Sequence, residues 1–202
     1  MEYIKSKLSD DLAKKIIGNQ DNAIKYLLCL NDIKPIKSLK FKTITRGQNA
    51  GKKVLNMKTS ELWKAIVDSW DYEESKKIIR DIFKQTEKYK SGKEADKAMD
   101  ILIKEWQSLK LGNIAWPFSQ GAFDEFVQRI NSEKENGFIR DEKVKVAAVK
   151  YRRIKEINTV RNDFIETLIF EKNNNILPTL NHRRGVDFFI NGISFDQKVA
   201  KS

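Results

Sequence analysis

The stretch that decides the fold is Gly185-Val186-Asp187-Phe188-Phe189-Ile190-Asn191-Gly192-Ile193-Ser194-Phe195-Asp196-Gln197-Lys198. Asn-Gly between two apolar runs is the strongest short signal for a β-hairpin, because both residues of a type I′ turn need a positive φ. With Asn191-Gly192 as the two-residue turn, the strands pair outward from it. This register predicts that Asp187 lies directly opposite Asp196.

The two faces of the predicted hairpin differ in chemistry. Directly opposed residues have Cβ atoms about 4.5–5.5 Å apart, and alternate side chains share a face. Lys198 therefore joins Asp187 and Asp196 on one face. Two opposed carboxylates repel each other, so this face needs a cation, which a divalent metal would supply. The other face is apolar, and we expect it to pack on the core: Val186, Phe188, Ile190, Ile193, Phe195 and Val199.

Asp187 followed by Asp196-Gln197-Lys198 resembles the PD-(D/E)XK motif of restriction endonucleases and related nucleases, with Val186 where the motif's name has proline. The resemblance implies an α+β fold with a restriction endonuclease-like core. It implies that Asp187 and Asp196 bind Mg²⁺, a hard cation that prefers oxygen ligands, and that the backbone carbonyl of Gln197 completes the ligands. Lys198 would orient or deprotonate the attacking water, so Asp187, Asp196 and Lys198 are the expected catalytic residues.

Residues 140–172 show the longest run of helical apolar spacing, directly before the hairpin. In the resembling family, a helix at this place often contributes a further acid to the metal site. Glu166 is the first candidate for this acid, and Asp163, one turn earlier, is the alternative. The asparagines at 173–175 and Pro178 predict a loop between the helix and the hairpin.

The remaining sequence is expected to be mostly helical. Residues 1–138 are predicted to form a helical region for DNA recognition, in which Gly18-Asn19 divides a helical run over about 9–30. Residues 139–202 would form the start of the catalytic core, with the hairpin at 185–200. The family's core usually continues beyond this strand, so we expect a truncated core in a chain that stops at Ser202.

Basic residues gather in the segment 33–60, which has eight of them and no acid. We expect this segment to form a loop or a short ribbon whose lysines contact DNA phosphates; its alternative is a solvated loop. Arg183 and Arg184, just before the hairpin, are placed to hold a phosphate near the metal, or else to balance the nearby acids. The residues predicted to contact DNA in the basic segment are Lys40, Lys42, Arg46, Lys52 and Lys53.

Composition limits the possible functions. The chain has 202 residues, 40% of them hydrophobic, and a formal net charge of +11, which favours a polyanionic partner such as nucleic acid. Cys29 is the only cysteine and His182 the only histidine, so a thiolate zinc site is excluded and a Ser-His-Asp triad is not expected. We expect Cys29 to be buried. No apolar run reaches the roughly 18 residues of a membrane span, so a cytoplasmic protein without an organic cofactor is expected.

These observations predict a Mg²⁺-dependent endonuclease that acts on double-stranded DNA. Cutting both strands with one site per chain favours a symmetric homodimer, which makes a type II restriction endonuclease the preferred specific function. A repair or type IV nuclease of the same fold is an alternative. The alternatives from other classes are a non-catalytic nucleic-acid-binding protein and an interaction module without nucleic acid.

Overall fold

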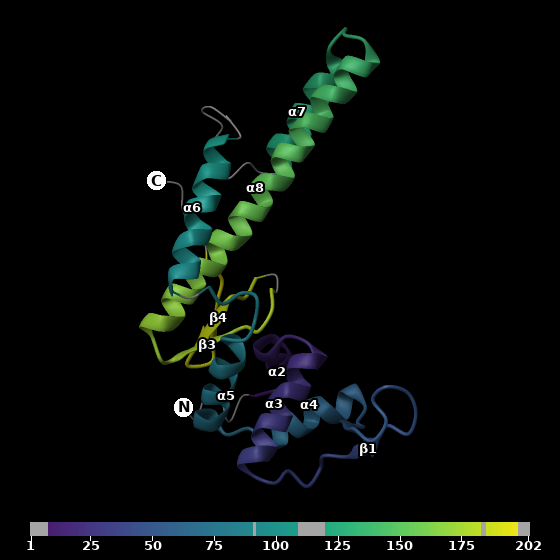
Figure 1. Cartoon of the computed structure of the whole chain (residues 1–202). Coiled ribbons are helices and arrows are strands. Elements are labelled where there is room, and N and C mark those ends of the chain that lie inside the picture. Colours follow the sequence, from purple (N-terminus) through teal and green to yellow (C-terminus); the bar gives the residue numbers. More distant parts are fainter. Residues whose placement is uncertain (1–7, 91, 109–119, 183–184, 198–202) are drawn as a thin grey trace. The chain divides into compact units, whose positions relative to one another are not determined.

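The computed structural model describes residues 8–90, 92–108, 120–182 and 185–197. These residues form an α+β structure in which helices predominate (Figure 1). The helices are α2 (Asp10–Ile17), α3 (Gln20–Ile33), α4 (Thr59–Asp68), α5 (Tyr72–Phe83), α6 (Gly92–Ser108), α7 (Gln120–Ser132) and α8 (Gly137–Lys172). The strands are β1 (Phe41–Thr43), β2 (Lys53–Leu55), β3 (Ile176–Pro178), β4 (Phe188–Ile190) and β5 (Ile193–Phe195).

The chain divides into two compact units. The first combines residues 1–89 with 166–198, and the second is formed mainly by residues 90–165. The boundary predicted between residues 138 and 139 does not coincide with this division. The reason is that the end of α8 and the strands after it share one hydrophobic core with the N-terminal helices, through Phe170 and Phe189.

Two capped helices replace a single long one at the start of the first unit, as the sequence predicted. The Asn19 side chain accepts a hydrogen bond from the backbone N–H of Asn22 at 2.9 Å and so begins α3. Gly18 ends α2 with φ +96°, a left-handed conformation that glycine adopts without a Cβ penalty.

The core of the first unit lies between α2, α3, α4 and α5 and also receives side chains from α8, β3 and β4. Its largest fully buried members include Leu27, Ile66 and Phe83. The Tyr26 and Ser75 hydroxyls form a buried hydrogen bond of 2.6 Å between α3 and α5. Burial raises the pKa of the Tyr26 phenol, so this hydroxyl stays neutral and bonded.

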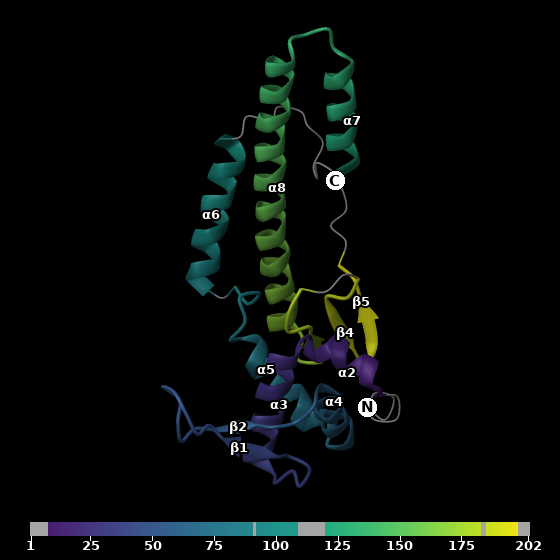
Figure 2. The ribbon, with the colours of Figure 1, turned by 90° about the vertical axis from the view of Figure 1, so that its right-hand side faces the viewer.

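The predicted β-hairpin is confirmed. β4 and β5 pair antiparallel around Asn191 and Gly192, whose φ angles of +50° and +83° are both positive. Phe188 pairs with Phe195 at the far end of the ladder, as the two-residue turn requires. Figure 2 shows β4 and β5 side by side.

The segment expected to be a loop before the hairpin contains a strand, so that prediction was wrong. β3 pairs antiparallel with β4, with Leu177 opposite Phe189 and Pro178 opposite Phe188. The three strands form a meander in the order β3, β4, β5. Proline is tolerated because β3 is an edge strand, where a missing N–H need not interrupt the ladder. The neighbouring asparagines concealed this short apolar strand from sequence reasoning.

The expectation that the Phe188 face of the hairpin packs on the core was wrong for Ile193 and Phe195 and correct for Val186, which belongs to the core. Phe189 is only 1% exposed, whereas Ile193 is 59% and Phe195 40% exposed. Because Leu177 of β3 pairs with Phe189 and both are buried, the third strand decides which face turns inward.

Arg80 of α5 joins the helical core to the end of α8. Its guanidinium donates to the backbone carbonyls of Phe170, Asn173 and Ile176 at 3.0, 3.2 and 3.0 Å. It also stacks on the Phe170 ring, with 3.8 Å between the guanidinium carbon and the ring centroid. One side chain thus satisfies orphan carbonyls at the C-terminus of α8 and fixes the start of β3.

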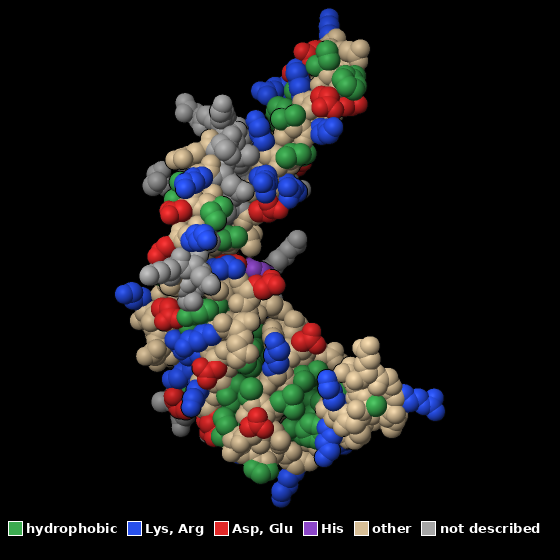
Figure 3. Space-filling model, in the orientation of Figure 1, with side chains coloured by type: hydrophobic (Ala, Val, Ile, Leu, Met, Phe, Trp, Pro, Cys, Tyr) green, Lys and Arg blue, Asp and Glu red, His purple; other side chains and the backbone are tan. Residues whose placement is uncertain are grey.

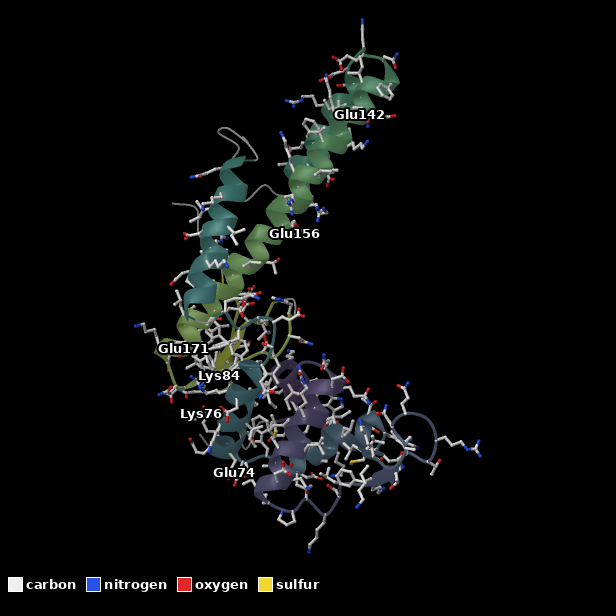
Figure 4. The ribbon with its side chains drawn as sticks, viewed as in Figure 1. Glu74, Lys76, Lys84, Glu142, Glu156 and Glu171 are labelled. Atoms are coloured by element: carbon white, nitrogen blue, oxygen red, sulfur yellow. The ribbon has the colours of Figure 1, made fainter. Side chains whose placement is uncertain are left out.

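We expect Arg80→Ala to lower the free energy of unfolding by about 2 kcal/mol, because buried carbonyls lose a charged donor. Urea denaturation followed by far-UV circular dichroism measures this effect. Lys84→Ala is the matched control, since Lys84 is an exposed cation at the end of the same helix (Figure 4). Equal urea midpoints for the two variants would show that the Arg80 contacts do not stabilise the unit.

The second unit contains a helical hairpin of α7 and the first part of α8. Lys143 of α8 forms ion pairs with Glu133 at 2.8 Å and with Glu135 at 2.5 Å. Phe123 of α7 stacks on Tyr151 of α8 with ring centroids 5.3 Å apart. These contacts agree with the short connection between the two helices.

Two smaller predictions concern Cys29 and membrane-spanning helices. Cys29 is exposed rather than buried, because it lies on the outward face of α3. Among the residues that the structure describes, no helix has the length and apolar character needed to cross a membrane.

Candidate metal centre

Asp187 directly precedes β4 and Asp196 directly follows β5, so each lies next to the last pair of the ladder, Phe188 with Phe195. The backbone N–H of Asp187 donates to the carbonyl of Phe195 at 2.8 Å. The backbone N–H of Gln197 donates to Asp187 Oδ2 at 2.6 Å. The Asp187 carboxylate is therefore fixed to the main chain just after β5, next to Asp196 in the sequence. The direct pairing of Asp187 with Asp196 stays a prediction, because the ladder ends at Phe188 and Phe195.

The main chain at Asp187 is held from its other side by Thr179, the residue after β3. The Thr179 hydroxyl and backbone N–H donate to the carbonyl of Asp187 at 3.0 and 3.2 Å. The sequence gave no indication of this contact, because β3 was not predicted. Asp187 is thus anchored by both neighbouring segments of the meander, while Asp196 is exposed.

Gln197 supplies an oxygen that sequence reasoning did not single out. Its side-chain Oε1 is buried and receives no hydrogen bond from any of the described residues. A buried acceptor without a donor costs free energy unless another partner binds it. The backbone N–H of the same residue donates to Asp187, so Gln197 is tied to this carboxylate through its main chain. The sequence-based expectation concerned the backbone carbonyl of Gln197 instead.

Glu166 is buried, as a member of an interior site should be, but it contacts a lysine. Its carboxylate lies 2.6 Å from Lys88 Nζ, and the two side chains are 7% and 3% exposed. Lys88 follows α5 in the chain, and no motif pointed to it. The structure therefore shows Glu166 in an ion pair within the first unit. Asp163, the alternative helix acid, is buried too and falls in the second unit.

The donor types near the end of β5 are those that Mg²⁺ prefers. Two carboxylates and an amide oxygen are hard oxygen ligands, and Mg²⁺ keeps several waters rather than requiring an all-protein cage. Within the described ranges, no group of three or more His, Cys, Asp and Glu side chains is placed to hold a metal. The residues that would hold the ion are Asp187, Asp196 and Gln197, while Glu166 is engaged by Lys88.

Three predicted site residues lie outside the described residues: Lys198, Arg183 and Arg184. Lys198 directly follows Gln197 in the sequence, and the two arginines precede Gly185.

The basic segment forms a two-stranded antiparallel ribbon, as predicted. Lys42 of β1 pairs with Val54 of β2, and the backbone N–H of Ile44 donates to the carbonyl of Lys52 at 2.9 Å. Lys and Arg side chains project around this ribbon (Figure 3). The five cations predicted to contact DNA are all exposed: Lys40, Lys42, Arg46, Lys52 and Lys53.

Alternation along the strands divides these cations between the two faces of the ribbon. Lys40 and Lys42 are two residues apart and share a face, and Lys52 joins them because it bonds across to Ile44. Lys53 lies on the opposite face, paired with Thr43. Lys40 also lies 3.6 Å from Glu61 in an exposed ion pair. One face of the ribbon thus offers several cations to a polyanion.

Comparisons with known proteins give no match: no family model, no curated protein and no solved structure corresponds to this chain.

Proposed function

We propose that this chain is a Mg²⁺-dependent endonuclease acting on double-stranded DNA, with a restriction endonuclease-like core that works as a homodimeric type II enzyme. The observation that carries the proposal is the sequence of elements α8, β3, β4, β5, with Asp187 and Asp196 at the end of the β4–β5 ladder. A long helix followed by a meander with acids at this place agrees with the PD-(D/E)XK resemblance.

The chemistry follows from the donors at this end of the sheet. Asp187 and Asp196 hold the metal, and Gln197 adds an oxygen. When bound, Mg²⁺ lowers the pKa of a coordinated water and neutralises charge on the phosphate. Lys198, next in the sequence, orients or deprotonates the attacking water. Arg183 and Arg184 hold a neighbouring phosphate through charge-assisted hydrogen bonds.

The β1–β2 ribbon supplies the sequence-independent part of DNA binding in this proposal. Its exposed cations suit phosphate contacts, which position a protein on the duplex. The net charge of +11 adds long-range attraction to a polyanion.

The test is cleavage of supercoiled plasmid DNA by the purified protein. Linear product with Mg²⁺, and unchanged plasmid with excess chelator, are the expected results. Intact plasmid under both conditions, across a range of Mg²⁺ and Mn²⁺ concentrations, would overturn the proposal. Nicked circles without linear product would contradict only the homodimeric part of it.

The ribbon is tested by the salt dependence of DNA binding. We expect Lys42→Ala, Lys52→Ala and Lys53→Ala, combined in one variant, to flatten the plot of log K against log salt concentration. Each lost phosphate contact reduces the slope by about 0.9. Fluorescence anisotropy with a labelled duplex measures the slope.

The matched control for the ribbon variant removes three exposed lysines elsewhere in the first unit: Lys25→Ala, Lys77→Ala and Lys84→Ala. This control changes the net charge by the same amount and is expected to keep the wild-type slope. The same slope for both triple variants would remove the ribbon from the DNA-binding surface.

A second candidate function is a non-catalytic DNA-binding protein. The observation that favours it is the ion pair with Lys88, which engages Glu166, the acid expected at the metal. Salt-dependent binding to DNA without cleavage in Mg²⁺ or Mn²⁺ is the result expected from this candidate.

A further inference from the structure

Lys88 is the most deeply buried charged side chain that the structure describes. It is 3% exposed, less than Asp163 or Glu166. Burying a charge is costly unless it is paired and hydrogen-bonded. A buried ammonium therefore needs an opposite charge and hydrogen-bond acceptors beside it, and the contacts of Lys88 provide both.

The contacts of Lys88 connect the segment after α5 with α8 and with the residue that follows β3. Its ammonium lies 2.6 Å from the Glu166 carboxylate on α8. It also donates to Thr179 Oγ1 at 3.3 Å, after β3. The hydroxyl of Thr167 on α8 donates to the backbone carbonyl of Lys88 at 3.4 Å.

Thr179 contacts both Lys88 and Asp187 and so links the two residues. Its hydroxyl has one proton, which it donates to the carbonyl of Asp187 at 3.0 Å, so its oxygen is left to accept from Lys88. The donors and acceptors are thus consistent along the whole chain of contacts from Glu166 through Lys88 and Thr179 to Asp187. The chain of contacts lies entirely within the first unit.

We propose that Lys88 is a positioning residue of the candidate metal centre: it holds Glu166 and, through Thr179, fixes the main chain of Asp187. This inference rests on the proposed function, since it takes Asp187 as a metal ligand. Lys88 does not touch the metal or the DNA. Its role is to keep the Asp187 carboxylate where both the Gln197 N–H and the ion can reach it.

This arrangement has a measurable consequence for metal affinity. Partners behind a ligand orient it, and their loss typically weakens metal binding about 10- to 100-fold. Thr179→Val removes the hydroxyl at nearly constant volume and leaves the contact between Lys88 and Glu166 in place. Lys88→Met removes the ammonium and keeps an unbranched side chain of similar length. Both changes should weaken metal binding.

The experiment is calorimetric titration of the full chain with Mn²⁺, and with Ca²⁺ as a second probe. It compares wild type, Lys88→Met and Thr179→Val. Tyr26→Phe is the matched control, because it removes another buried hydrogen bond of the same unit, that between Tyr26 and Ser75. All titrations are carried out below the onset of thermal unfolding, which is recorded by circular dichroism for each variant.

The expected result is Mn²⁺ affinity reduced about 10- to 100-fold in Lys88→Met and Thr179→Val, with wild-type affinity in Tyr26→Phe. Equal affinities in all four proteins would overturn the inference and leave the proposed function intact. Absence of Mn²⁺ binding and of DNA cleavage in the wild type would overturn both. If Lys88→Met does not fold, Thr179→Val alone decides.

Discussion

Asp187→Asn and Asp196→Asn are each expected to reduce Mg²⁺-dependent cleavage of plasmid DNA at least about a thousandfold. Asparagine keeps the size of the side chain and removes the charge that we propose binds the ion. A metal stabilises the charge of the transition state by several kcal/mol. Each loss of about 1.4 kcal/mol lowers the rate tenfold. DNA binding should persist, because the basic ribbon is unchanged.

The control for these variants is Asp32→Asn. Asp32 is an exposed acid near the end of α3, so its loss changes the net charge equally without touching the hairpin. Initial rates of plasmid cleavage at saturating Mg²⁺ compare the three variants, and anisotropy with a labelled duplex reports binding. Cleavage by purified Asp196→Asn protein at the wild-type rate would refute the assignment of the metal centre.

The second large effect concerns the stability of the buried ion pair. Lys88→Met is expected to lower the free energy of unfolding by about 3–5 kcal/mol, because Glu166 loses the ammonium beside it in the interior. The double variant Lys88→Met with Glu166→Gln should recover most of this loss. Removing both charges of a buried pair often leaves the free energy of unfolding unchanged, because no charged group then has to be buried away from water.

Urea denaturation of the wild type, both single variants and the double variant gives the coupling energy of the pair as a double-mutant cycle. Additive losses in the two single variants would show that the side chains do not interact. Swapping the partners, with Lys88→Glu and Glu166→Lys, offers an independent comparison, because it keeps one charge of each sign in the interior.

Local patterns in the sequence predicted much of the fold. Asn191-Gly192 determined the turn and the register of β4 and β5, because only a few residues adopt positive φ at both positions. Gly18 and Asn19 likewise determined the break between α2 and α3. The basic ribbon was expected from its composition. In each of these cases the physical cause lies within a few neighbouring residues.

The features that the sequence did not reveal depend on contacts between distant residues. Leu177 and Phe189 decide which face of the hairpin is buried, and this pairing involves a strand that its asparagine-rich neighbours concealed. Arg80 reaches the C-terminus of α8, 90 residues away. Lys88 is an ordinary lysine by sequence and becomes notable only because it meets Glu166.

The candidate site was therefore only partly accessible to sequence reasoning. The placement of Asp187 and Asp196 at the end of the β4–β5 ladder followed from the register, whereas Thr179 and Lys88 did not. The side chain of Gln197 was overlooked because reasoning from the resemblance concerned its carbonyl. A motif indicates which residues bind an ion, but the residues that orient them come from the surrounding packing.

The division of the first unit between both ends of the chain has a consequence for synthesis. Residues 1–89 leave the ribosome long before residues 166–198, which complete their core. Until then, the core that α5 helps to form lacks Phe170, Leu177 and Phe189. The first unit can close only after residues 166–198 have been made. The N-terminal helices are therefore translated with exposed apolar surface, the state in which chains aggregate or bind chaperones.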